Sequence, residues 1–173
     1  MKLKVLTIAI AVSLFLATSA CSKQPERTYK DSVKTALEQA DLKDVRVSED
    51  TDKNTITLGG TLHSEDAKQK AANVAKANAG SRIVVNEVSV QPVGQESEAK
   101  SVASNLDDCI ESNYKAVLVA KGLDKQSIRF DAKNGVLTLK GHVKTTSQRK
   151  EAEQLAQAVP NVQQVLNEID VKR

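Results

Sequence analysis

Tryptophan is absent from this 173-residue chain, and the other aromatic residues are only two phenylalanines and two tyrosines. One of them, Phe15, lies in an N-terminal leader, which leaves Tyr29, Tyr114 and Phe130 for the folded protein. Ligand pockets are usually lined by aromatic and other large apolar side chains. A deep aromatic-lined substrate pocket is therefore not expected. Because basic residues are not interleaved with aromatic ones, nucleic acid is also an unfavourable partner.

Residues suited to catalysis or metal binding are equally sparse. The only histidines, His63 and His142, stand apart from other metal ligands, and the acidic residues are spread over predicted helix faces and turns. A catalytic site needs a nucleophile, a base and an orienting group in one pocket, or a metal cluster. We therefore predict that the protein is not an enzyme, and we expect no catalytic residue, metal site or cofactor.

There are only two cysteines, Cys21 and Cys109, and their spacing fits neither a zinc site nor a thiol–disulfide motif. Cys109 stands beside Ile110 on a predicted helix. For an unpaired cysteine in an oxidising compartment the alternatives are burial and an intermolecular disulfide. We expect Cys109 to be partly buried.

Residues 1–20 have the pattern of a secretory signal peptide. Lys2 and Lys4 form a short basic start before a largely apolar run over residues 5–16. This run is shorter than the ~20 residues that a membrane-spanning helix needs. The leader is therefore predicted to direct export rather than to span the membrane.

The end of the leader resembles the lipobox of bacterial lipoproteins. Small residues precede Cys21, although Thr18 stands where leucine is usual. The resemblance implies cleavage before Cys21 and lipidation of its thiol, with residues 21–27 as lipid anchor and tether. Ser22 after the cysteine resembles the pattern for sorting to the outer membrane. Cleavage to a soluble periplasmic protein is the alternative.

An internal repeat dominates the rest of the chain. Residues 55–90 recur without a gap as residues 136–171, at an offset of 81, with ten identical pairs in 36 positions. Among them are a glycine, Gly60 and Gly141, and an asparagine, Asn86 and Asn167. The protein is therefore built from one unit used twice.

Each copy has the same predicted order of elements. Apolar residues at three- and four-residue spacing indicate helices, and alternating residues indicate strands. Ser64 and the pair Thr145 and Gln148 are expected to cap the second helix of each copy. The expected elements are a helix over 31–40, strands over 45–47 and 55–58, a helix over 64–80 and a strand over 82–90, and then a helix over 109–121, strands over 127–130 and 136–140, a helix over 145–160 and a strand over 162–171.

This pattern predicts an α+β protein of two tandem α-β-β-α-β domains, each with two helices packed on a three-stranded mixed sheet. The domains cover residues 28–91 and 105–173. Residues 92–104, rich in serine, glutamine, glutamate and alanine, are either a flexible linker or an extension of the following helix. Asn86 and Asn167 share strand parity with valines, so we expect them to point inward and to bind a backbone group.

The paired motifs resemble those of the BON domain, a module of bacterial envelope proteins. The matching stretches read hydrophobic-x-Leu-x-Gly at residues 56–60 and 137–141, and continue after a helix at 83–88 and 162–169. Ser81 replaces the usual valine in the first copy. The resemblance covers nearly all of the chain after the leader. It implies a non-enzymatic envelope protein that binds phospholipid surfaces and supports outer-membrane integrity under stress.

Charge distinguishes the two copies. Residues 22–99 contain 11 Lys and Arg against 13 Asp and Glu, a net charge of −2, whereas residues 100–173 contain 12 against 9, a net charge of +3. Anionic lipid surfaces attract nearby basic groups. The second domain is therefore the better candidate for contact with an anionic phospholipid surface, and two ordinary solvated surfaces are the alternative.

The first helix of the second copy carries the candidate binding residues. The offset pairs Glu38 with Val119, which lies opposite Ile110 on the helix at about 100° per residue. Lys115 and Lys121 flank this apolar residue, and Tyr114 precedes them. We predict Tyr114, Lys115, Val119 and Lys121 as the membrane- or partner-binding residues. Packing of Val119 on the first domain, on the linker or on another subunit is one alternative, and no contact of either kind is the other.

Two functions follow from the sequence. The first is an outer-membrane lipoprotein, anchored through Cys21 on the periplasmic side, whose second domain binds anionic phospholipid. The second is an adaptor that docks another envelope protein, with lipid contact only through the anchor. The sequence does not identify the lipid, the protein partner or the oligomeric state.

Overall fold

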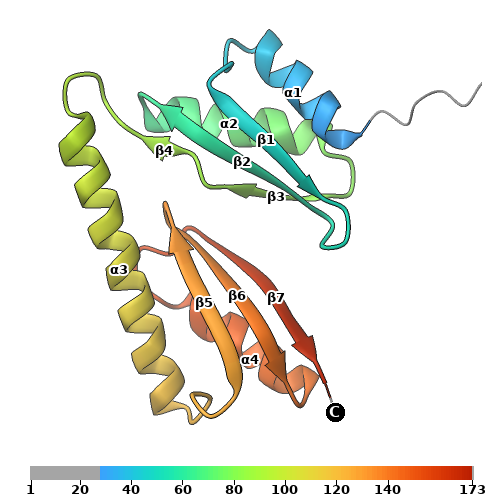
Figure 1. Cartoon of the computed structure of the whole chain (residues 1–173), viewed down its shortest axis with the longest axis vertical. Helices are drawn as coiled ribbons and strands as arrows, with labels where there is room; N and C mark the ends of the chain where they lie inside the picture. Colours follow the sequence, from blue (N-terminus) through green and yellow to red (C-terminus); the bar gives the residue numbers. More distant parts are fainter. Residues whose placement is uncertain (1–27, 173) are drawn as a thin grey trace, which may run out of the picture.

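The computed structural model describes residues 28–172 as two domains joined by one long helix (Figure 1). Each domain has the predicted α-β-β-α-β order, and the α+β prediction is confirmed. The signal peptide, the lipidation site Cys21 and the tether over residues 21–27 lie outside the described residues. The first domain contains α1 (Tyr29–Gln39), β1 (Val45–Asp50), β2 (Thr55–Leu62), α2 (Glu65–Asn78), β3 (Ile83–Asn86) and β4 (Ser89–Val90), and the second contains α3 (Glu96–Ala120), β5 (Ser127–Lys133), β6 (Val136–Val143), α4 (Thr146–Gln157) and β7 (Gln164–Val171).

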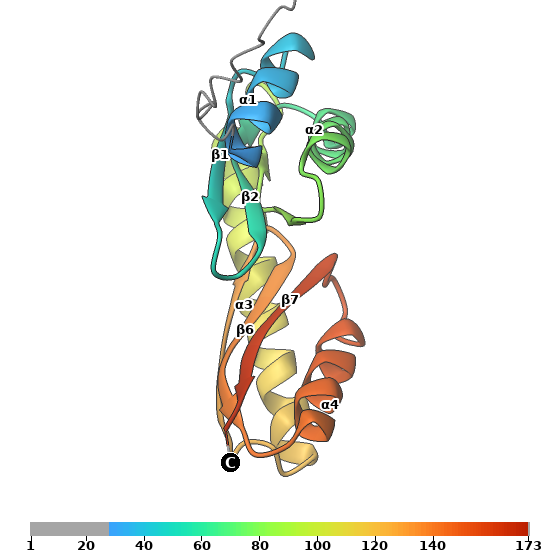
Figure 2. The ribbon, with the colours of Figure 1, turned by 90° about the vertical axis from the view of Figure 1, so that its right-hand side faces the viewer.

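Both sheets are mixed, with the middle strand paired on both sides. β2 pairs antiparallel with β1 and parallel with β3 and β4, and β6 pairs antiparallel with β5 and parallel with β7. In each domain the core lies between the helices and one face of the sheet, and Figure 2 shows α2 and α4 on the same side of their sheets. The predicted caps are confirmed: Ser64 accepts from the amide of Ala67, and Thr145 and Gln148 form a capping box.

One glycine in each middle strand permits close contact with the neighbouring strand. Gly60 and Gly141 have φ of +113° and +105°, and a Cβ atom there would overlap the backbone carbonyl oxygens of Asp44 and Ser127. Each of these two glycines therefore allows a close approach of two backbone segments. The strand itself is not interrupted, because β2 keeps its pairing with β1 through Gly59 and Gly60.

The repeated asparagines connect the last strand of each domain to its second helix. Asn86 Nδ2 donates to the carbonyl of Lys68 at 3.1 Å, and Asn167 Nδ2 donates to the carbonyl of Arg149 at 3.2 Å. Each Oδ1 also accepts from the backbone amide two residues later. Since Lys68 and Arg149 are themselves 81 residues apart, the two copies make the same bonds. The predicted inward orientation and backbone partner are confirmed.

The first copy departs from prediction in its last strand, which breaks between β3 and β4. At this break the carbonyl of Glu87 accepts from Asn134 Nδ2 of the second domain at 2.9 Å. The corresponding strand of the second copy, β7, is continuous. The expected single strand over residues 82–90 is therefore two short strands, and the break lies where the other domain binds.

Most of the segment between the domains extends the following helix and is not a flexible linker, since α3 begins at Glu96. Two carboxylates hold this helix beside the edge strand β5 and its turn. Asp107 accepts from the amides of Asn134 and Gly135 at 2.8 and 3.0 Å, and Glu111 accepts from the amide of Ala132 at 2.9 Å. α3 is therefore fixed to the second domain from about its midpoint onward. Among residues 28–172, no helix combines the length and apolar character that crossing a membrane requires.

The domains bind each other reciprocally. Lys53 in the β1–β2 turn forms an ion pair with Glu168 of β7 at 2.8 Å. Lys133 at the end of β5 forms one with Glu87 at 2.7 Å. Glu87 and Glu168 are equivalent positions of the repeat. The hairpin end of each domain therefore binds the last strand of the other.

Uncharged contacts support the same junction. Gln164 Nε2 donates to the carbonyl of Val84 at 2.8 Å, and its Oε1 accepts from the amide of Asn86 at 3.4 Å. Gln164 thus binds the backbone on both sides of Val85. Val85 is fully buried and Val136 is 2% exposed, although neither belongs to the core of its domain. The junction between the domains therefore has a buried apolar part as well as ion pairs.

The adjacent glycines of β2 provide a matched test of the close contact. Gly60→Ala should lower the free energy of unfolding by about 1–3 kcal/mol, because alanine disfavours positive φ and its Cβ would overlap Asp44. Gly59→Ala should be neutral or stabilise slightly, since no atom lies within 4 Å of its added Cβ. Urea unfolding of both variants measures the difference. Equal effects would contradict this account of Gly60.

Candidate membrane-contact surface

Tyr114 is a core residue rather than a surface contact. It is fully buried in α3, its hydroxyl donates to the carbonyl of Ala152 in α4 at 3.1 Å, and its ring packs edge-on against Phe130 with 5.1 Å between centroids. Burial raises the pKa of the Tyr114 hydroxyl above its ordinary value. The prediction that Tyr114 contacts a membrane or partner is wrong, because this position of the helix faces the sheet.

The other three predicted residues lie on the outer side of α3 and at its end. Val119 is 56% exposed, and Lys115 and Lys121 are exposed. Lys115 and Val119 are four residues apart and therefore share one helix face. Together they border a hollow with a volume of about 470 Å³, whose other lining residues include Leu118, Leu123, Ile128 and Phe130. Val119 thus stands beside Lys115 and a partly apolar hollow, whose lining also includes Glu111, Ser112 and Asp124.

The structure decides against two of the alternatives for Val119. The C-terminal end of α3 lies at the end of the second domain that is farther from the first domain (Figure 1). With more than half of its surface exposed there, Val119 packs neither on the first domain nor on the segment before α3. Contact with a membrane, contact with another protein and an ordinary solvent-exposed position remain for this residue.

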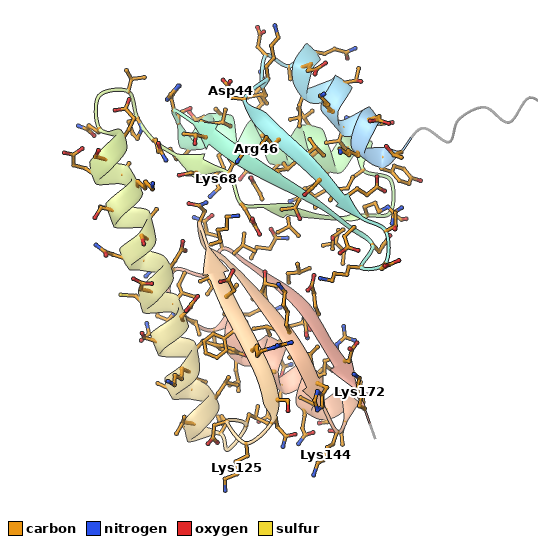
Figure 3. All side chains as sticks on the ribbon, in the orientation of Figure 1. Asp44, Arg46, Lys68, Lys125, Lys144 and Lys172 are labelled. Carbon is orange, nitrogen blue, oxygen red and sulfur yellow. The ribbon has the colours of Figure 1, made fainter. Side chains whose placement is uncertain are left out.

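Three further lysines lie at this same end of the second domain. Figure 3 shows Lys125, Lys144 and Lys172 there, in the loop after α3, after β6 and after β7. The amide of Lys172 donates to the carbonyl of Val143, which places the last two of these segments side by side. With Lys121 after the last residue of α3 they form a set of four exposed lysines, which we call the basic pole. Asp124 and Asp170 are the nearest acidic residues along the chain.

The sequence signal for the basic pole lies in the repeat offset, mostly outside the first helix of each copy. With the repeat offset of 81 residues, the four lysines correspond to Ala40, Asp44, His63 and Gln91 of the first domain. These four positions therefore carry four positive charges in the second domain and, with histidine neutral, one negative charge in the first.

Cys109 is exposed on α3, so the expected partial burial is wrong. Its neighbour Ile110 occupies the core-facing position of the helix instead. Among residues 28–172, no three histidine, cysteine, aspartate or glutamate side chains are grouped as metal ligands.

Comparisons with known proteins agree with the repeat. The model of the BON domain matches residues 26–92 and 107–173. Osmotically inducible protein Y of Escherichia coli (strain K12) is 31% identical over 142 residues, which cover 81% of this chain and 69% of that protein.

Among solved structures, the C-terminal domain of CdsD, the structural protein of the type III secretion system of Chlamydia trachomatis, is similar with a TM-score of 0.32 at 15% identity. The similarity covers 80% of this chain, which spans 62% of the length of that chain. At this TM-score the similarity carries no argument about function.

Removal of the buried hydroxyl tests the core role of Tyr114. Tyr114→Phe should lower the free energy of unfolding at pH 7 by about 1 kcal/mol, through the lost hydrogen bond to Ala152. Because the pKa of Tyr114 is raised in the folded state, its contribution is complete below its unfolded pKa of 10.0 and declines as pH rises above it. Tyr114→Phe should therefore lose less stability than the wild type between pH 9 and 11. Tyr29→Phe, at a residue 41% exposed, is the control in urea unfolding. A larger effect at Tyr29 would contradict the assignment.

Proposed function

The chain belongs to the BON-domain family, and on that premise we propose that it is a non-enzymatic lipoprotein of the cell envelope. In this proposal Cys21 anchors it to the periplasmic face of the outer membrane, and the second domain binds anionic phospholipid and supports outer-membrane integrity. A soluble periplasmic location is the alternative if Cys21 is not lipidated. The observation that carries the proposal is the basic pole, which exists in the second domain and not at the matching positions of the first.

The magnitude of the attraction fits a weak, reversible contact. A basic residue near an anionic membrane surface contributes about 1 kcal/mol, so four lysines supply at most about 4 kcal/mol. That free energy alone corresponds to a Kd of about 1 mM. Asp124 and Asp170 reduce it further. Such a contact is weak for a free protein, and it becomes effective when a lipid anchor keeps the protein at the membrane.

Val119 adds an apolar component to the same end of the molecule. Full burial of a valine side chain contributes roughly 1.5–3 kcal/mol, and Val119 is more than half exposed. Lys115 on the same helix face can meet a lipid phosphate while Val119 enters the headgroup region, as in interfacial helices. The expected contact therefore combines charge attraction with burial of one aliphatic side chain.

Vesicle sedimentation tests the proposal with the protein that starts at Ser22. The wild type should bind phosphatidylglycerol vesicles better than phosphatidylcholine vesicles, and less so at higher salt. Simultaneous Lys→Gln replacement at 121, 125, 144 and 172 should weaken binding at least about tenfold. Val119→Glu should weaken it further.

A matched set of charge removals controls for net charge alone. Lys30, Lys34, Lys43 and Lys76 are exposed lysines of the first domain, and their replacement by glutamine should change binding less than about twofold. If both sets of replacements weaken binding equally, attraction is a property of the whole chain and not of the basic pole. If the wild type does not prefer phosphatidylglycerol, the lipid proposal is wrong.

A second candidate function is an adaptor for another envelope protein. The observation that favours it is the partly apolar hollow beside Val119, because an inserted side chain of a partner could fill it. A photo-crosslinking residue at 119 in cells, followed by mass spectrometry, separates the two functions. Under the adaptor hypothesis one protein adduct dominates at 119 and is absent when the same residue is placed at 93, where the native valine is 77% exposed. Lipid adducts without a protein adduct would reject the adaptor.

A further inference from the structure

A buried lysine lies at the junction of the two domains. Lys68 of α2 is 6% exposed, the lowest exposure of any charged residue in the described chain. Figure 3 places it where the first domain faces the hairpin of the second. Its Nζ donates to the carbonyl of Asn134 at 3.2 Å and to Gln163 Oε1 at 3.4 Å. Both acceptors are neutral, and both bonds are long.

The fold itself does not require this burial. Arg149 occupies the equivalent place in the second copy, where it is exposed and donates to the carbonyl of Asn167. Lys68 is buried because Asn134 and Gln163 of the second domain lie against it. Desolvation lowers the pKa of Lys68, while the more distant charges of Glu65 and Asp107 act in the opposite direction. A buried lysine usually has a carboxylate partner, and among the described ion pairs within 4.0 Å Lys68 has none.

Lys68 and its two acceptors form part of the wall of an open groove with a volume of about 580 Å³. This volume is within the range of about 300–1,000 Å³ that is typical of sites for small ligands. The remaining wall is mostly apolar, and much of it comes from the N-terminal half of α3. The apolar lining residues are Val90, Pro92, Ala99, Val102, Ala103, Leu106, Ile110 and Val162.

The α3 side of the groove carries exposed apolar surface. Val102 is 57% exposed and Leu106 is 42% exposed, one helical turn apart on the same face. Among the other lining residues, Val90 comes from β4 of the first domain, Pro92 from the segment between β4 and α3, and Val162 from the second domain. The groove therefore exists only when α3 and both domains are in place.

Three carboxylates also line the groove and oppose an anion. Asp107 uses both of its oxygens to bind the amides of Asn134 and Gly135. Glu65 and Glu98 are exposed, so water and salt screen their charges more than they screen the charge of Lys68. An anion in direct contact with the ammonium is attracted over a short, desolvated distance, where the Coulomb interaction is strongest, and this attraction opposes the repulsion.

We propose that this groove binds a single-chain amphiphile with an anionic head, of the class of a long-chain fatty acid or a lysophospholipid. The head accepts the N–H of Lys68 that Asn134 and Gln163 do not use, and the acyl chain lies along Val102 and Leu106. The site is separate from the basic pole, at the other end of the second domain. It binds a monomeric amphiphile rather than a membrane surface, so it does not depend on the proposed function.

Titration calorimetry with the protein that starts at Ser22 tests this site below the critical micelle concentration. The probes are hexadecanoate and palmitoyl-lysophosphatidylglycerol, with palmitoyl-lysophosphatidylcholine as the probe without net charge. We expect one binding site per chain for at least one of the two anionic probes. Binding of hexadecanoate would identify a carboxylate head, and binding of palmitoyl-lysophosphatidylglycerol a phosphodiester head. Lys68→Met should weaken that binding about tenfold or more, through loss of a charge-assisted hydrogen bond.

Two more variants distinguish an anion site from other uses of the groove. Glu98→Gln removes an opposing charge and should tighten anion binding by about two- to threefold. Leu106→Ser should weaken binding, whereas Val93→Ser, outside the groove, and Lys34→Met, on α1, should not. Leu106→Ser also covers the case in which Lys68→Met fails to fold, because Leu106 is partly exposed.

Several results would overturn the proposal. These are equal binding of the uncharged and anionic probes, unchanged binding in folded Lys68→Met, or weaker anion binding in Glu98→Gln. A concentration-dependent dimer in sedimentation that Leu106→Ser abolishes, without binding of either anionic probe, would assign the groove to a second copy of the chain.

Discussion

The reciprocal binding between the two domains is the contact on which the functional surfaces of this protein depend. Each hairpin end supplies a lysine to the equivalent glutamate of the other domain, and Gln164 binds backbone groups on both sides of the buried Val85. Partly exposed ion pairs contribute little free energy by themselves. Together with the buried valines and the amide bonds, they fix the orientation of one domain relative to the other. That orientation buries Lys68, forms the groove beside α3 and leaves the opposite end of the second domain free.

Duplication has preserved the residues of the fold and changed the residues of the surface. Gly60 and Gly141 permit the same close strand contact, and Asn86 and Asn167 make the same bonds to helix carbonyls. At the far end of the second domain, four lysines have no basic counterpart in the first. The shared bonds are internal to each domain, so both copies need them. Solvated positions carry no such requirement, and there the two copies have diverged.

Much of the fold was predictable because the repeat shows the sequence pattern of most elements twice. The inward asparagines and the caps of α2 and α4 followed from position and residue type alone. Tyr114 was wrongly placed on the surface because its core-facing orientation depends on the exact phase of α3 against the sheet. The predicted partial burial of Cys109 was wrong for the same reason, since its neighbour Ile110 takes the buried position. Of the basic pole, Lys121 was predicted, whereas Lys125, Lys144 and Lys172 were missed because they come from three segments outside the helices that lie apart in the sequence.

The sequence by itself determined the two α-β-β-α-β units, their middle strands and the excess of positive charge in the second. These features depend on local periodicity, on turn residues and on composition, which short stretches of chain contain. Only the tertiary structure decided which lysines share one end of the molecule, that Lys68 is buried and that α3 borders a groove. Each of these depends on contacts between residues that are distant in the chain, and a pattern along one segment cannot specify them.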